Sequence, residues 1–150
     1  MIYLLRHGVA ERSNGADAKR RLTAEGKRQS EAAGLALAAL GAPVEACLTS
    51  PKLRASETAE LACEALGIPA EIAESLAGGA FDALELAAGR GEAMLVGHEP
   101  DFSNEIARLT GARAKLHKGG LAIVDGNTLL ALLRPPELAA IAARGNQARA

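Results

Sequence analysis

The chain has 150 residues, of which 49% are hydrophobic and 23% are charged, and its formal net charge at pH 7 is −1. This length and apolar content predict one folded domain over residues 1–150, with a core of useful size, and exclude a disordered chain. A charge so close to zero gives no basis for salt-driven binding of nucleic acid. Only 2% of the residues are aromatic, so the core has to be built from small aliphatic side chains.

The two cysteines, Cys47 and Cys63, are too few for a disulfide scaffold and lack the spacing of a zinc site. We interpret both as small buried hydrophobic residues. No apolar run approaches the length of a membrane span, and the first apolar run begins at Ile2, which leaves no room for a leader. We therefore expect a soluble, cytoplasmic protein without a membrane partner.

Short apolar runs alternate with longer segments of helical pattern along the chain. The expected strands are Ile2–Leu5, Ala46–Thr49, Ala70–Ala73, Ala93–Val96, Leu121–Val124 and Thr128–Leu133. The expected helices lie near Thr23–Leu40, Arg54–Leu66, Phe81–Ala88, Phe102–Leu109 and Pro136–Ala143. The alternation predicts a three-layer α/β/α sandwich around a mostly parallel sheet of about six strands. Asp125-Gly126-Asn127 is a tight-turn sequence, so the last two strands are expected to form an antiparallel hairpin.

The first expected strand runs directly into Arg6-His7-Gly8. Open α/β sheets place their ligands at the carboxyl ends of their strands. Arginine offers a fixed fork of donors for phosphate oxygens, an imidazole can attack phosphorus, and glycine lets the backbone approach a ligand closely. Alone, the tripeptide is a weak signal, because a chance Arg-His after a strand is the commoner explanation. The prediction of an anion site therefore depends on further Arg or His residues elsewhere in the chain.

Two later strand ends carry similar residues. Ser50-Pro51 interrupts the chain after the second strand, and Arg54 then stands at the start of a helix, where backbone N–H groups favour anions. The fourth strand ends at Gly97, and His98 follows. Each segment alone is an ordinary loop, but three strands that deliver Arg or His to one sheet edge predict an anion site.

The ordered set of motifs resembles the histidine phosphatase superfamily, which has the phosphoglycerate mutase-like fold. The resemblance rests on Arg6-His7-Gly8, on Ser50-Pro51 with Arg54-Ala55 and Thr58-Ala59, and on Gly97-His98. Within the superfamily the chain is most similar to the short SixA-like phosphohistidine phosphatases, on the residues Asp17, Arg20, Leu22, Thr23 and Gly26, on Gly97-His98-Glu99-Pro100, and on a length that leaves no room for a large cap. Arg21 stands where that group often has proline.

The resemblance implies a reaction at His7. His7 would be the nucleophile and would form a phosphohistidine intermediate, while Arg6, Arg54 and His98 would bind the phosphoryl oxygens. His7 then has to be unprotonated at the attacking nitrogen, whereas we expect His98 to serve as a cationic donor. The expected substrate-binding residues are Gly8, Arg20 and Ser50. No metal ion and no cofactor is expected.

The general acid of this reaction is left open by the sequence. Many members of the superfamily carry a Glu after the third strand, and Gly78 stands at that place here. Glu74 and Asp82 are near but offset, and a solvent-facing or helix-capping role explains both more readily. A missing acid favours an N–P substrate, because the nitrogen of phosphohistidine leaves easily once solvent protonates it.

We therefore expect a phosphatase that acts on phosphohistidine in a protein. The alternatives are a phosphatase for small phosphoesters that uses Glu74 or Asp82, an inactive phosphate-recognition module and, less favoured, a mutase. Two basic groups are either solvated surface or a positive rim that attracts an acidic phosphoprotein; they comprise Lys19, Arg20, Arg21, Lys27 and Arg28, and Arg113, Lys115, His117 and Lys118. The oligomeric state is not predicted.

Overall fold

The computed structural model describes residues 1–13 and 15–149. Its centre is a six-stranded sheet in the order β3-β2-β4-β1-β5-β6. The strands are β1 (Ile2–Arg6), β2 (Ala46–Thr49), β3 (Ala70–Ile72), β4 (Ala93–Gly97), β5 (Leu121–Asp125) and β6 (Thr128–Leu133). The first four strands are parallel, β5 is antiparallel to β1, and β6 is antiparallel to β5. The mostly parallel sheet and the terminal hairpin are as the sequence predicts.

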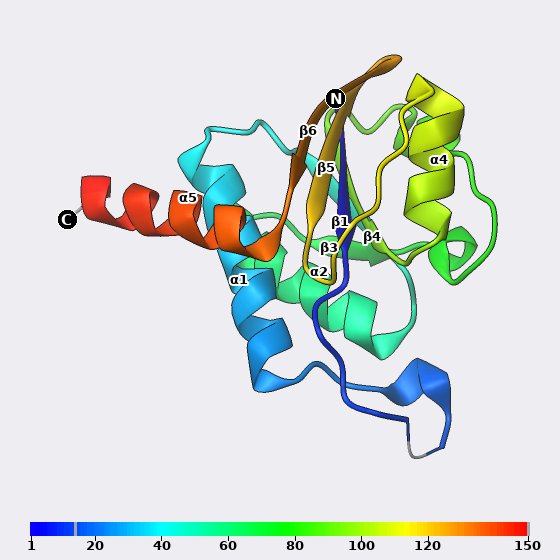
Figure 1. Ribbon diagram of the computed structural model, residues 1–150, viewed down its shortest axis with the longest axis horizontal. Helices are drawn as coiled ribbons and strands as arrows, with labels where there is room; N and C mark the ends of the chain where they lie inside the picture. Colours follow the sequence, from blue (N-terminus) through cyan, green and yellow to red (C-terminus); the bar gives the residue numbers. More distant parts are fainter. Residues whose placement is uncertain (14, 150) are drawn as a thin grey trace.

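Helices cover both faces of the sheet (Figure 1). The longer helices are α1 (Ala24–Ala39), α2 (Leu53–Leu66), α4 (Asp101–Thr110) and α5 (Pro135–Arg149); α3 (Ala83–Ala87) and the 3-10 turns η1 (Asp17–Lys19) and η2 (Glu74–Leu76) are short. Alternate side chains of β1 point to opposite faces. Tyr3 and Leu5 pack with α1, α2 and α5, whereas Ile2 and Leu4 pack with α3 and α4. The three-layer sandwich is thereby confirmed.

Small residues let the helices of the first layer approach closely. Ala33, Ala59 and Ala62 are fully buried in that layer. Gly34 of α1 lies so close to α2 that a Cβ atom at this position would collide with the carbonyl oxygen of Ala62. Because these helices lie so close together, the core is tightly packed even though few of its side chains are aromatic.

Capping side chains and glycine residues set where several of the helices begin and end. The Thr23 side chain accepts a hydrogen bond of 3.1 Å from Gly26 N at the start of α1, and Gly67 ends α2 in the left-handed region with φ 68°. Helix α3 is shorter than predicted because Asp82 caps it. Helix α5 is longer than predicted, since it continues through residues 144–149. No helix within the described ranges is long and apolar enough to cross a membrane.

Three parallel strands bring the functional segments to one edge of the sheet. Arg6 at the end of β1 is in register with Gly97 at the end of β4, and β2 lies on the other side of β4. Backbone hydrogen bonds continue past the strands, from His7 N to Gly97 O at 3.1 Å and from Ser50 N to Val96 O at 2.9 Å. These contacts fix the first residues of three separate loops beside one another.

Candidate active site

A cavity of about 260 Å³ lies at this edge of the sheet. Five of the seven site residues expected from the sequence line it, namely Arg6, His7, Arg20, Arg54 and His98. Two further cations, Lys52 and Lys118, also line it, together with the acidic residues Glu99 and Asp101. The cavity is therefore dominated by positive charge and by two imidazole rings, a composition suited to an anion.

The ring of His7 is held in one orientation by its own loop. Its backbone donates to Gly97 O and accepts from Gly119 N, and its Nδ1 lies 2.7 Å from the carbonyl oxygen of Gly8. A carbonyl oxygen only accepts, so Nδ1 carries the proton and Nε2 has the free lone pair. Burial is the main reason that the pKa of His7 is lowered to about 4; the contact with Gly8 O raises this pKa, and the charges of Arg54, Arg6 and Lys118 lower it. At neutral pH the ring is uncharged and nucleophilic at Nε2.

His98 has the opposite arrangement. Its Nε2 lies 2.8 Å from Ser50 Oγ, and that same oxygen accepts a hydrogen bond of 3.1 Å from Lys52 N. In the part of the chain that the structure describes, His98 Nε2 is the one acceptor within reach of the buried Ser50 hydroxyl, so we assign the hydroxyl as the donor to Nε2 and the proton of the ring to Nδ1. Among the described residues this buried Nδ1 has no hydrogen-bond partner. An N–H group without a partner beside a cationic cavity is suited to donate to an oxygen of a bound anion.

The charge of His98 differs from the expectation. Burial is the main reason that its pKa is lowered to about 3, and His7, Arg54 and Lys52 act in the same direction. The ring is thus neutral at neutral pH, so the group that it offers as a donor is a neutral N–H rather than an imidazolium. The two rings lie close together, with their centroids 5.2 Å apart and their planes at 55°.

Arg54 is buried in the first turn of α2, as the sequence indicates, and is oriented by Asp17 of η1. Its Nη1 donates to Asp17 O at 3.1 Å, and its Nη2 donates to Asp17 Oδ2 at 3.2 Å. Asp17 also forms ion pairs with Arg20 and Lys52. The hydrogen bond from Arg20, followed by the charge of Arg54, lowers the pKa of this carboxyl group. One ionised carboxylate thus gathers three cations at the mouth of the cavity.

Arg6 is fixed by a segment far along the chain. Its Nη1 donates to Leu116 O at 2.8 Å, and Leu116 N donates to Glu99 Oε2 at 3.2 Å. Glu99 in turn accepts hydrogen bonds from the backbone N–H and the hydroxyl of Ser103 at the start of α4. Within the described chain, the Nε atoms of Arg6 and Arg54 are both buried without a partner. Both guanidinium groups therefore retain an N–H for a further acceptor.

Gly8 and Ser50 do not line the cavity, although both are expected to bind substrate. The N–H of Gly8 donates to Thr58 Oγ1 at 3.1 Å, and a Cβ atom at Gly8 would lie only 2.6 Å from Gly26 O. Gly8 therefore allows the loop after β1 to pass close to α1 rather than offering its N–H to a ligand. Ser50 acts on the cavity only through its hydrogen bond to His98.

Neither acid candidate named from the sequence lies at the cavity. Glu74 is exposed in η2. Asp82 accepts from Leu84 N and Glu85 N as the cap of α3 and pairs with Arg108 at 3.2 Å, which is a structural role. Gly78, by contrast, does line the cavity. The acidic residues that do line the cavity are Glu99 and Asp101, which the sequence analysis did not consider as acids, although their position within three residues of His98 was the available signal. In the described part of the chain no cluster of three or more His, Cys, Asp or Glu residues is arranged to hold a metal ion.

The family model of the histidine phosphatase superfamily (branch 1) matches residues 2–107. The chain belongs to this superfamily. The matched range extends from β1 into α4 and includes the three segments that meet at the cavity. Members of the superfamily are phosphatases. No curated protein gives a significant match to the chain.

Solved structures with the same fold include several phosphatases. The protein histidine phosphatase SixA complexed with tungstate is 23% identical, and the alignment covers 91% of this chain and 98% of that one with a TM-score of 0.79. A protein assigned to SixA from Agrobacterium tumefaciens is 24% identical, with 89% and 97% covered and a TM-score of 0.75. Phosphoserine phosphatase from Entamoeba histolytica, in complex with 3-phosphoglyceric acid, is 14% identical, with 91% and 98% covered and a TM-score of 0.66. At these identities the likeness shows the fold.

Proposed function

We propose that this protein is a phosphatase that removes the phosphoryl group from phosphohistidine in a protein substrate, with His7 as the nucleophile. The observation that carries the proposal is the hydrogen bond of His7 Nδ1 to Gly8 O, 2.7 Å long, which fixes the lone pair on Nε2 in a cavity lined by cations. An imidazole that is neutral, oriented and surrounded by oxyanion donors is suited to in-line attack on phosphorus.

The reaction has two steps. In the first, Nε2 of His7 attacks phosphorus, the P–N bond of the substrate breaks, and the leaving imidazole takes a proton from solvent. In the second, water attacks the phosphorus of phospho-His7, the new P–N bond breaks, and inorganic phosphate leaves while Nε2 regains its lone pair. The sum is the hydrolysis of one N–P bond by one water molecule.

The surrounding donors stabilise the charge on the phosphoryl oxygens in both steps. Arg6 and Arg54 each retain a buried Nε–H, and His98 retains its Nδ1–H. Phosphoryl transfer depends mainly on such positioning and electrostatic stabilisation. Loss of one donor of this kind costs about 100-fold or more in kcat. Tungstate is a tetrahedral oxyanion like phosphate, and the SixA structure of similar fold was obtained with it.

The leaving group favours phosphohistidine over an alkyl phosphate. Gly78 lines the cavity without a titratable side chain, and Glu74 and Asp82 lie elsewhere. Glu99 is engaged by Ser103 and Leu116. The nitrogen of phosphohistidine takes a proton from solvent easily, whereas an alkoxide needs an acid within the site.

A small phosphoester is the second candidate substrate, and Asp101 favours it. Asp101 lines the cavity from the first turn of α4 and, unlike Glu99, is not engaged by Ser103 or Leu116, so it is the candidate proton donor for an alkoxide. The phosphoserine phosphatase of Entamoeba histolytica shows that a similar fold serves a small substrate.

The test is a time course of phosphate release with a phosphohistidine protein and p-nitrophenyl phosphate offered in parallel to the wild type and to His7→Ala. We expect faster release from the phosphohistidine protein and none from the variant, whose melting temperature shows that it is folded. Faster release from the aryl ester assigns the enzyme to small substrates. No release from either, with tungstate still bound, indicates a phosphate-recognition module.

A further inference from the structure

Residues 112–118 cross the edge of the sheet between α4 and β5 and show the alternating burial of an edge strand. Ala114 and Leu116 are buried in the core, whereas Arg113, Lys115 and His117 are exposed. Leu116 is held on one side by Arg6 and on the other by Glu99. The segment is therefore anchored through its inward residues and presents a row of basic side chains outward.

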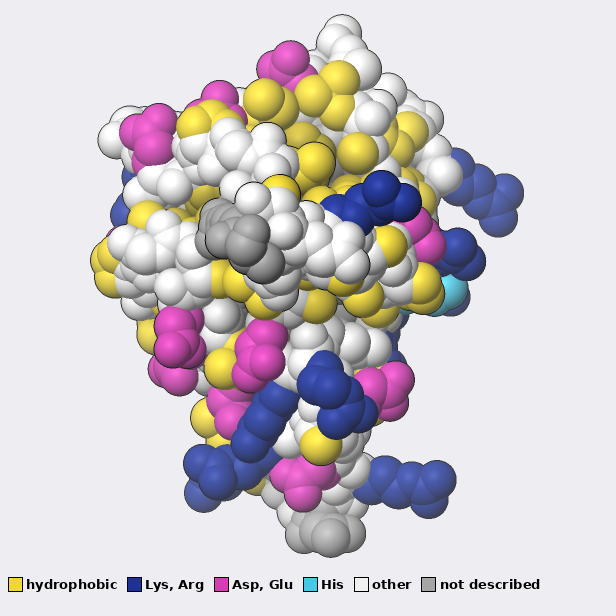
Figure 2. All heavy atoms as spheres, turned by 90° about the vertical axis from the view of Figure 1, so that its left-hand side faces the viewer, with side chains coloured by type: hydrophobic (Ala, Val, Ile, Leu, Met, Phe, Trp, Pro, Cys, Tyr) yellow, Lys and Arg dark blue, Asp and Glu magenta, His cyan; other side chains and the backbone are white. Residues whose placement is uncertain are grey.

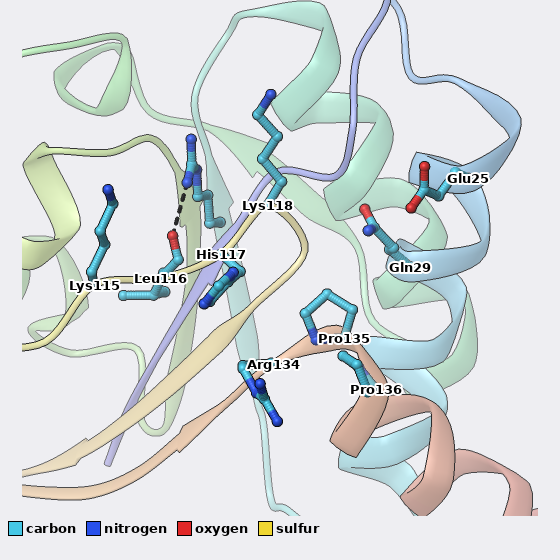
Figure 3. Close-up of a pocket in the computed structure, with 10 residues that line it drawn as sticks. Glu25, Gln29, Lys115, Leu116, His117, Lys118, Arg134, Pro135 and Pro136 are labelled. Atoms are coloured by element: carbon cyan, nitrogen blue, oxygen red, sulfur yellow. Dashed lines mark hydrogen bonds between the residues drawn. The ribbon is translucent and has the colours of Figure 1, made fainter.

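Two clefts flank this segment, and we call them the α1 cleft and the α4 cleft. The α1 cleft, of about 630 Å³, lies between Lys115–Lys118, the side chains of Glu25 and Gln29, and the start of α5 (Figure 3). The α4 cleft, of about 780 Å³, is lined by Arg113 and Lys115 on one side and by the start of α4 on the other. Arg6 lines both clefts and the catalytic cavity, so the three recesses adjoin one another.

The charges of the chain are strongly segregated around these recesses. Eight of the 17 Lys and Arg residues line the cavity or one of the two clefts, against three of the 18 Asp and Glu residues, which gives this set a formal charge of +5. The remaining nine basic and 15 acidic residues carry −6. If Asp17, which lies at the mouth of the cavity, is added to this set, the set is still positive and the rest of the chain is still negative. On the side of α5, acidic and basic side chains are interspersed (Figure 2).

The cations of the segment are not neutralised by neighbours. Across residues 1–13 and 15–149, no ion pair involves Arg113, Lys115 or Lys118. By contrast, Arg90 pairs with Glu71, and Arg108 pairs with Glu105. Side chains that keep their charge unpaired beside a cavity raise the local concentration of anionic ligands and steer their approach.

We propose that Arg113, Lys115 and Lys118 form a docking ridge for acidic side chains that surround the phosphohistidine of the protein substrate. The proposal rests on the proposed function and names the kind of protein surface that the site selects. The catalytic cavity, at about 260 Å³, is far smaller than a folded protein, so most of a protein substrate has to lie outside it, and the ridge with its two clefts is the surface that adjoins it.

A nucleic acid fits this surface less well than an acidic protein. Binding of single strands relies on exposed aromatic rings that stack with bases. The chain has three aromatic residues, of which Tyr3 and Phe102 are buried in the core, and none lines the cavity or either cleft. The negative remainder of the chain would also repel a long polyanion.

The experiment compares two phosphohistidine peptides, one flanked by glutamates and one by glutamines, with free phosphohistidine as the reference for the chemistry. The variant is Arg113→Gln/Lys115→Gln, since neither residue lines the catalytic cavity. The control is Arg90→Gln/Arg144→Gln, which removes the same charge from exposed positions that line neither the cavity nor the two clefts. The quantity measured is kcat/KM at low and high salt.

For the wild type we expect about a 10-fold preference for the glutamate-flanked peptide at low salt, reduced at high salt. The ridge variant should lose most of this preference and keep its rate on free phosphohistidine, and the control should behave like the wild type. Equal kcat/KM on both peptides, or a preference that survives in the ridge variant, would contradict the proposal that the ridge binds acidic side chains.

A binding measurement separates this proposal from the catalytic one. If free phosphohistidine is not hydrolysed, the proposed function fails. Fluorescence anisotropy with an unphosphorylated glutamate-rich peptide then still tests whether the ridge binds acidic side chains. Binding about 5-fold weaker in the ridge variant than in the control supports it. Equal binding by the two variants, or tighter binding of single-stranded DNA than of the peptide, contradicts it.

Discussion

His7 and His98 face each other across a centroid distance of 5.2 Å, and their hydrogen bonds are inverted. His7 donates from Nδ1 to Gly8 O, which leaves a lone pair on Nε2, whereas His98 accepts at Nε2 from Ser50, which leaves a proton on Nδ1. The two rings have the same chemistry and similar burial, yet His7 is suited to attack and His98 to donation. The neighbouring carbonyl and hydroxyl groups cause this difference, and a difference in charge between the rings does not.

The first prediction concerns Ser50. Substitution Ser50→Ala removes the donor that fixes the tautomer of His98, so the proton moves to Nε2 in part of the molecules. We expect kcat to fall by about 10-fold, with a smaller change in KM, and the nitrogen NMR signals of His98 to show the mixed tautomer. Ser56→Ala in α2, whose hydroxyl donates to Leu53 O at 3.1 Å, is the matched control. An unchanged kcat in Ser50→Ala would remove Ser50 from the mechanism.

The second prediction is a loss of stability in acid. The pKa values of His7 and His98 are lowered in the folded state to about 4 and about 3, so between pH 6.5 and 4 the unfolded chain binds more protons than the folded one. Stability is therefore full above pH 6.5 and falls as pH decreases, by about 2 kcal/mol per ring at pH 5. Thermal unfolding at pH 7 and pH 5 measures the loss. His98→Asn should lose less on acidification; an equal loss would contradict the assignment.

The third prediction places Glu99 as a positioning residue that acts through Arg6. Substitution Glu99→Gln weakens its hold on Leu116 N, and Leu116 O is the acceptor that orients Arg6. We expect about a 10-fold loss in kcat for Glu99→Gln and about 100-fold or more for Arg6→Ala. The decisive measurement is the double variant, which should be no slower than Arg6→Ala alone. Additive losses would show that Glu99 acts independently of Arg6.

The fourth prediction concerns packing between α1 and α2. Alanine favours a helix over glycine by about 1 kcal/mol, yet at Gly34 its Cβ would collide with Ala62 O. We therefore expect Gly34→Ala to lower the free energy of unfolding by about 2 kcal/mol, because the two helices have to separate. Urea unfolding measures the change. A variant as stable as the wild type would show that the helices move apart without cost.

The parts of the site that follow from the sequence are those set by strand ends. Apolar runs of four to five residues end at Arg6, Thr49 and Gly97, and a parallel sheet brings such ends to one edge regardless of the distance along the chain. For this reason the meeting of His7, Arg54 and His98 could be predicted. The helix caps at Thr23 and Gly67 are likewise set by local chemistry.

The remaining parts depend on tertiary contacts that leave no local pattern. Lys118 reaches the cavity from an irregular segment, and Arg6 depends on Leu116, 110 residues away. Gly8 was expected to contact the ligand, whereas in the structure it packs closely against Gly26. Asp82 was a candidate acid only by its proximity in sequence, and the structure uses it to cap α3.

The most direct test of the account is to trap the phosphorylated enzyme. The wild type is mixed with substrate carrying a radiolabelled phosphoryl group, quenched in alkali within milliseconds, and digested for mass spectrometry. We predict label on Nε2 of His7, released by acid and absent from His7→Ala. Phosphate release by the wild type with no label on His7, or label on His98 instead, would contradict the central role of His7.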